Sequence, residues 1–128
     1  MDNRIAEDKA QPIELTLQGA RYCMSISKGV IRALGEPSHV SIKVNDTNDS
    51  ISVFPCDEDD VMAFRVPDKL LTDHKCVMRI NSKAFVHGIM KANVLDISRS
   101  YTLAGEYLKE KNAAVFSLTD RVTLRKNK

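Results

Sequence analysis

Hydrophobic and polar residues alternate with a period of two in several short stretches of the chain, which is the pattern of half-buried β-strands. The first two stretches, 13–17 and 22–26, are separated by a Gln-Gly-Ala break and predict a hairpin. A second hairpin is predicted over 40–44 and 51–55, which flank a turn rich in Asn and Asp. Further short strands are predicted at 64–66, 77–80, 101–103 and 114–118.

Two segments instead carry hydrophobic residues at the spacing of an α-helix. Ser27 is a suitable N-cap for a two-turn helix over 28–34, and Gly35 supplies the left-handed residue that ends it. Ser82 is the corresponding cap of a second helix over 83–90. The pattern therefore predicts an α+β, mostly β fold with two short helices.

The order of elements recurs along the chain. Ser82 lies 55 positions after Ser27, and a strand, a short helix, a strand, a turn and a strand occur in both places. We therefore predict one domain over 12–120 made of two similar halves, 12–67 and 75–120, packed about a pseudo-twofold axis. A chance recurrence in a generic α+β domain is the alternative. The predicted core consists of Ile26, Val30, Ile31, Leu34, Val40, Ile42, Val44, Ile51, Val53, Phe85, Leu103, Val115, Phe116 and Leu118.

Length and composition place the chain among globular proteins. It has 128 residues, of which 43% are hydrophobic and 28% are charged, so folding can bury about two thirds of the surface of the unfolded chain. No apolar stretch exceeds four residues, which leaves no candidate for a spanning helix or a signal-peptide core. We expect a cytoplasmic protein that binds no membrane, with a flexible N-terminal tail over 1–11 and a basic C-terminal tail over 121–128.

Residues suited to catalysis or metal binding do not form a known arrangement. His39, His74 and His87 lie near no cysteine or serine in a nucleophile pattern, and no glycine-rich phosphate loop occurs. His74 and Cys76 have a spacing that can chelate a metal on a strand, but no second ligand pair accompanies them. We therefore expect no enzymatic activity, no metal and no other cofactor. Small buried side chains in a reducing compartment are expected for Cys23, Cys56 and Cys76.

Three segments resemble a known family: 25–35 (SISKGVIRALG), 40–44 (VSIKV) and 51–55 (ISVFP). Together they resemble the swapped-hairpin domain of AbrB-type and MraZ-type (SpoVT-AbrB-type) bacterial transcription regulators, which combines a strand, a short helix ending in Leu-Gly and a hairpin. The resemblance covers roughly 21–56 and, more weakly, 77–118.

The resemblance implies both a fold and a function. It implies that the two tandem halves interlace into a pseudo-symmetric barrel with short helices, and that a basic face near the strand-helix corners docks on DNA. The chain departs from the family at two places. Ser27 stands where the family usually has proline, and Ile31-Arg32 stands where it favours paired arginines.

For contact with double-stranded DNA, the resemblance selects seven basic residues. Such residues neutralise phosphates and release counterions, so about six contacts make binding strongly salt dependent. Arg32 can in addition address guanine edges in a groove. Ordinary solvated charges at the ends of elements remain the alternative. The seven residues are Arg21, Lys28, Arg32, Lys43, Arg79, Lys83 and Lys91. The function that follows is non-enzymatic, DNA-binding transcription regulation in a bacterial or phage setting.

A run of four acidic residues offers a second working surface. The net charge of +2 does not decide between the two surfaces. A solvated loop is the simplest interpretation of the run, which lacks the glycine and the distal glutamate of a calcium loop. The alternative function is a protein-binding module, such as a small inhibitor or adaptor of a phage or mobile element, that uses strand edges and Asp57, Glu58, Asp59 and Asp60. Homo-oligomers formed by strand exchange are expected as well.

Overall fold

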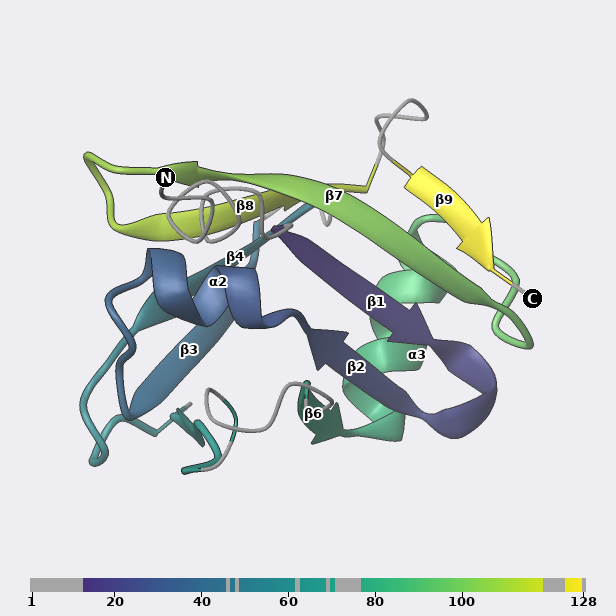
Figure 1. The fold of residues 1–128 in the computed structure, drawn as a ribbon. Helices are drawn as coiled ribbons and strands as arrows, with labels where there is room; N and C mark the ends of the chain where they lie inside the picture. The colour runs from purple at the N-terminus through teal and green to yellow at the C-terminus, as the bar shows by residue number, and fades with distance from the viewer. Residues whose placement is uncertain are drawn as a thin grey trace, which may run out of the picture.

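In the computed structural model, the described residues are 13–45, 47, 49–61, 63–68, 70, 77–118 and 124–127 (Figure 1). They form a mostly β fold in which an antiparallel sheet curls into a nearly closed, barrel-like shape, accompanied by two short α-helices. The coarse prediction of a mostly β domain is therefore confirmed. No helix of this part of the chain is long and apolar enough to cross a membrane.

Most elements lie close to the positions that the sequence pattern predicts, but those at Gly19–Arg21 and Leu124–Asn127 were not predicted. The strands are β1 (Glu14–Gln18), β2 (Cys23–Ile26), β3 (His39–Val44), β4 (Ser50–Pro55), β5 (Phe64–Arg65), β6 (Met78–Asn81), β7 (Ser100–Leu108), β8 (Ala113–Ser117) and β9 (Leu124–Asn127). The helices are the 3-10 helix η1 (Gly19–Arg21) and the α-helices α2 (Lys28–Ala33) and α3 (Lys83–Ala92). The strand order is β5-β3-β4-β8-β7-β1-β2-β6, and β9 pairs with β7.

β7 joins the two parts of the sheet and is longer than the predicted strand over 101–103. Its residues up to Ala104 pair with β1, and its residues from Gly105 onward pair with β8. A Cβ on Gly105 would collide with the ring of Phe116, so glycine lets that ring lie against the strand where the partner changes. β9, in the segment expected to be a basic tail, pairs with the first part of β7.

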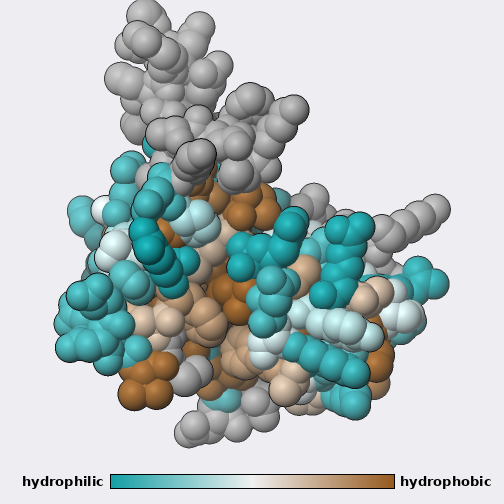
Figure 2. All heavy atoms as spheres, turned by 90° about the horizontal axis from the view of Figure 1, so that it is seen from below, coloured by the Kyte–Doolittle hydropathy of each residue, from teal (hydrophilic) through white to brown (hydrophobic). Residues whose placement is uncertain are grey.

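One hydrophobic core lies between the sheet and the helices. Figure 2 shows hydrophobic residues in the middle of one face of the molecule, bordered by hydrophilic ones. Of the predicted core residues, all are buried except Val44, Phe85 and Val115, which are partly buried. Val115 alternates with the buried Ala114 and Phe116 and therefore lies on the outer face of the sheet. Buried residues that were not predicted include Leu15, Leu17, Met24, Met78, Ile80, Val86 and Met90.

The two helices begin in different ways. The Ser82 hydroxyl accepts a hydrogen bond from the Phe85 amide (3.3 Å), so the predicted cap of α3 is confirmed. Ser27 occupies the predicted N-cap position of α2, but its hydroxyl makes no cap hydrogen bond. It accepts instead from the Glu14 amide (3.1 Å) and ties α2 to the start of β1. Gly35 has a φ of 89°, the left-handed conformation predicted for it after α2.

Candidate nucleic-acid interface

A buried glycine fixes the turn between β1 and β2, which lies on the right of Figure 1. The Gly19 amide donates to the Arg99 carbonyl oxygen (3.1 Å), and the Gly19 carbonyl accepts from His87 Nε2–H (2.8 Å). A Cβ on Gly19 would collide with the carbonyl oxygen of Ile97. The turn is therefore held between α3 and the loop before β7, and only glycine fits there.

Tyr22 follows this turn in the left-handed conformation, with a φ of 58°. The residue is 45% exposed, and its ring lies edge-on to that of His87, with the ring centroids 5.2 Å apart. The Lys83 ammonium lies over the same ring, 5.0 Å from its centroid, which is a cation–π contact. The Ser82 amide also donates to the Tyr22 carbonyl oxygen (3.0 Å). These contacts orient Lys83 at the first residue of α3.

Next to this turn, a cleft of about 460 Å³ is lined by Ala20, Arg21, Ser98, Arg99 and Ser100. Asp96 contacts two of these lining residues, because it accepts from the amide and the hydroxyl of Ser98 (2.9 and 2.6 Å) and contacts Arg99 Nε (3.4 Å). The hydrogen bonds from Ser98, more than the charge of Arg99, lower the pKa of Asp96. We call Arg21, Tyr22, Lys83, His87 and Arg99 the basic corner.

The basic corner contains two of the seven predicted DNA-binding residues. Arg21 and Lys83 form no ion pair with another described residue. Arg79 is exposed on the adjoining strand β6, with its Cα opposite that of Ser25. Lys91 lies in the last turn of α3, at the far end of the helix from Lys83.

The remaining three predicted residues lie elsewhere. Lys28 and Arg32 are on α2, and Arg32 contacts Glu36 at 3.8 Å between partly exposed side chains. Such an exposed pair contributes little stability but reduces the positive charge offered to a ligand. Lys43 lies on β3, beside a separate cleft that Lys111 also lines. The described structure thus brings together Arg21 and Lys83, but not Lys28, Arg32 or Lys43 with them.

The acidic run lies at the other end of the molecule, in the loop that follows β4 at the lower left of Figure 1. A cleft of about 530 Å³ there is lined by Ser38, Cys56, Asp57, Glu58 and Asp59. We call residues 56–60 the acidic corner. The carboxylates of Asp57, Glu58 and Asp59 form no ion pair with a described residue.

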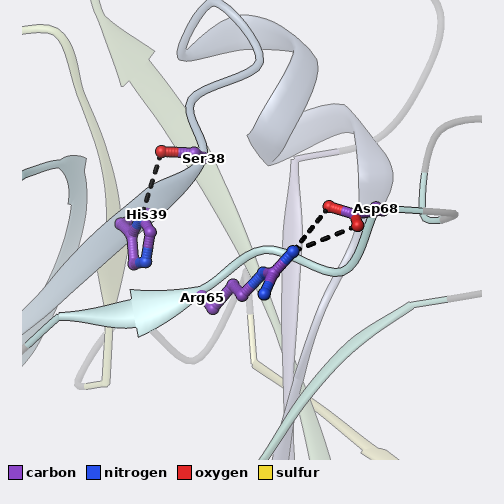
Figure 3. Close-up of polar contacts among 4 residues, drawn as sticks. All are labelled: Ser38, His39, Arg65 and Asp68. Atoms are coloured by element: carbon purple, nitrogen blue, oxygen red, sulfur yellow. Dashed lines mark hydrogen bonds and ion pairs between the residues drawn. The ribbon is translucent and has the colours of Figure 1, made fainter. Parts of the chain in front are cut away.

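The acidic corner is attached to the start of β3, which pairs with β4 on one side and with β5 on the other. The Cys56 amide donates to the His39 carbonyl oxygen (3.1 Å). Figure 3 shows the Ser38 hydroxyl beside His39 Nδ1 (2.9 Å), while Arg65 extends away to Asp68 and contacts both of its carboxylate oxygens at 3.1 Å. The guanidinium of Arg65 is therefore used locally and does not neutralise the acidic loop.

Candidate catalytic and metal-binding residues are dispersed in this structure. His39 contacts Ser38, and His87 contacts Gly19, whereas His74 and Cys76 lie outside the described residues. Burial, followed by the negative charges of Asp60 and Asp57, raises the pKa of the Cys56 thiol. Within the described ranges, no group of three or more His, Cys, Asp or Glu side chains is arranged to hold a metal ion.

Sequence reasoning missed Tyr22 and Arg99 in the basic corner and Lys111 in the second cleft. The local signal for a constrained, exposed aromatic residue was the place of Tyr22 three residues after Gly19, next to the predicted break of the hairpin. Arg99 joins the corner through the Gly19 hydrogen bond, which links distant segments of the chain. Comparison with family models, curated proteins and solved structures found no match for this chain.

Proposed function

We propose that this protein is a non-enzymatic, DNA-binding transcription regulator built from two swapped-hairpin halves of the AbrB and MraZ type. The basic corner is the observation that carries the proposal. It combines Arg21 from the β1–β2 turn, Lys83 from the start of α3 and Arg99 from the loop before β7. A strand-helix corner is where the resemblance puts the DNA-binding face.

The strand pairing supports the proposed relation between two similar halves. Here the boundary between the halves is placed before β5, although β5 lies within the predicted first half, 12–67. The first group then has the order β1, β2, α2, β3, β4, and the second has the order β5, β6, α3, β7, β8. Exchanging the halves converts the β1–β7 pair into β5–β3 and the β3–β4 pair into β7–β8, and leaves β2–β6 and β4–β8 as they are. Two pairs lack a described counterpart. They are β1–β2, whose equivalent would join β5 to β6, the two ends of the sheet, and β7–β9, because β9 belongs to neither half.

The register between β2 and β6 supports the same proposal. Cys23 pairs with Asn81, and Ile26 pairs with Met78. Met78 and Asn81 lie 55 positions after Cys23 and Ile26, which is also the spacing of Ser27 and Ser82. Antiparallel pairing of equivalent strands at this register has the local twofold symmetry that two interlaced halves require.

The proposal is tested by fluorescence anisotropy with a labelled double-stranded DNA of random sequence. We expect binding at low salt that weakens toward physiological salt, with a slope of log K against log salt near −2 for about two phosphate contacts, by Arg21 and Lys83. Arg99 is not counted, because it already contacts Asp96 at 3.4 Å. Absence of binding at low salt would overturn the proposal. Light scattering of the same sample tests the proposed homo-oligomer.

The second candidate function is a protein-binding module that uses the acidic corner. It is favoured by the cleft beside Asp57, Glu58 and Asp59, whose charges no described residue pairs with. A basic protein surface is the partner that such a corner fits. The expected result for this function is capture of a host protein by the wild type but not by an Asp57→Lys, Asp59→Lys variant, without DNA binding.

A further inference from the structure

A cleft of about 620 Å³ lies on the outer face of the sheet and shares no lining residue with either corner, and we call it the lysine cleft. Its lining includes Lys43 from β3, Ser52 and Phe54 from β4, and Lys111 and Ala113 from the β7–β8 turn and β8. Ser52 and Phe54 alternate with the buried Ile51 and Val53, so they project outward. The volume is in the range of small-molecule sites.

Residue size explains why a hollow forms here. Ser52 and Ala113 are small, whereas Lys43, Phe54 and Lys111 around them are large. Phe54 is half-buried, so its ring is held by the sheet while part of it faces the cleft. A fixed aromatic surface of this kind binds planar rings by stacking.

Charge and hydrogen bonding define the other half of a ligand. Lys43 and Lys111 are exposed, come from different elements and form no ion pair with a described residue. Asn45 also lines the cleft, two residues after Lys43. Its side-chain oxygen accepts from the amides of Asp49 (2.8 Å) and Ser50 (3.0 Å), which holds the β3–β4 turn in place at this edge of the cleft. Two ammonium groups suit a phosphate dianion better than a carboxylate monoanion, since each supplies a separate full charge.

We infer that the lysine cleft binds a small organic phosphate that carries an aromatic ring, the chemistry of a nucleotide. The ring stacks on Phe54, and the phosphate lies between Lys43 and Lys111. This site uses none of the residues of the basic corner, so it does not depend on the proposed DNA binding. It gives Lys43, one of the seven predicted DNA-binding residues, a different role.

The test is an NMR titration of the full ¹⁵N-labelled chain with phenyl phosphate, inorganic phosphate and phenol. We expect saturable shifts at the amides of Ser52, Phe54 and Ala113, and affinity for phenyl phosphate about tenfold above that for either fragment. The absence of saturable shifts at these amides would overturn the inference. Equal affinity for phenyl phosphate and inorganic phosphate would overturn it too.

Matched variants separate the two halves of the ligand. A Lys43→Gln, Lys111→Gln variant is expected to lose the preference for phenyl phosphate over phenol, and Phe54→Ala is expected to lose the preference over inorganic phosphate. Lys109→Gln changes a lysine of the same turn outside the cleft lining and is expected to bind like the wild type. An equal loss in Lys109→Gln contradicts the site. The wild-type ranking of the three probes tests the inference even if a variant fails to fold.

Discussion

The basic corner and the acidic corner carry opposite charges, and they also differ in how firmly those charges are held. In the basic corner, Lys83 lies over the Tyr22 ring, and Arg21 ends the short 3-10 helix that begins at Gly19, whose amide and carbonyl are both hydrogen-bonded. The acidic corner is an exposed loop whose described hydrogen bonds include the Asp60 amide to the Asp57 carbonyl oxygen (3.1 Å).

This difference bears on binding. Side chains and loops that are ordered before binding lose less conformational entropy when a partner arrives. The basic corner is organised in this way, whereas the acidic loop must still order its carboxylates on a partner. For this reason we rank the DNA-binding function above the protein-binding function, and each experiment below changes one corner while keeping the other as a reference.

The largest expected effect is on DNA affinity when the basic corner is reversed in charge. An Arg21→Glu, Lys83→Glu variant is expected to bind random DNA about 100-fold more weakly at low salt, because two attractions become repulsions. Glu at position 83 lies in the first turn of α3, where the helix dipole favours negative charge, so folding is preserved. Fluorescence anisotropy measures the affinity, and thermal melting checks the fold.

Two controls sharpen that experiment. Lys109→Glu makes the same kind of change outside both corners and is expected to have a much smaller effect. Arg32→Glu is also expected to matter less, because Arg32 already contacts Glu36. If the Lys109→Glu or Arg32→Glu loss equals that of the double variant, the basic corner is not the interface.

The next largest effect concerns the glycine that supports the basic corner. Gly19→Ala is expected to lower the free energy of unfolding by about 1–3 kcal/mol, because the new methyl group meets the backbone of the loop before β7. Gly88→Ala is the matched control, since its Cβ meets no atom within 4 Å and a helical position gains about 0.5–1 kcal/mol. Denaturant unfolding measures both, and a Gly19→Ala variant as stable as the wild type contradicts the packing described here.

Asp96 makes the same corner sensitive to acid. Hydrogen bonds from Ser98 are the chief cause that lowers the pKa of Asp96 below its ordinary value of 3.8. The ionised carboxylate therefore stabilises the folded protein at pH values above 3.8. This stabilisation is lost as the pH falls through the lower pKa that Asp96 has in the folded state. Asp96→Asn is therefore expected to melt below the wild type at pH 7, and the two melting temperatures are expected to converge in acid. A difference that stays constant with pH rules out this role.

The smallest expected effect lies in the acidic corner. The raised pKa of Cys56 keeps its thiol protonated and slow to alkylate at neutral pH. An Asp57→Asn, Asp60→Asn variant is expected to alkylate about two- to threefold faster, because two negative charges that disfavour the thiolate are removed. Mass spectrometry of the Cys56 peptide measures the rate. Glu58→Gln is the control, because Glu58 is not among the charges that raise the pKa of Cys56, and it is expected to leave the alkylation rate unchanged. Equal acceleration in Glu58→Gln would contradict the role of Asp57 and Asp60.

Local patterns were sufficient to predict most of the elements. The segment from β2 through α2 to β4 follows from alternating apolar residues, Gly35 and the Asn-rich turn. Ser82 was predicted as a cap and is one. Ser27 was also predicted as a cap and stands at the N-cap position of α2, but its hydroxyl accepts from the Glu14 amide on β1, a contact that no local pattern contains.

What the sequence could not predict depends on distant segments. β9 contains Arg125 and Lys126, so it was assigned to a basic tail, yet its backbone pairs with β7. Arg99 and Lys83 reach the β1–β2 turn only because β6 and β7 pair with the neighbouring strands. The residue types of the DNA-binding surface could thus be predicted, but their grouping into separate corners required the topology.

The central claim is that the basic corner contacts DNA phosphates, and the salt dependence of binding tests it most directly. The slope of log K against log salt is measured for the wild type and for an Arg21→Gln, Lys83→Gln variant with random double-stranded DNA. We predict that the variant's slope is shallower by about 2, one unit for each lost phosphate contact. Parallel slopes for the two proteins would show that neither residue contacts phosphate and would contradict the claim.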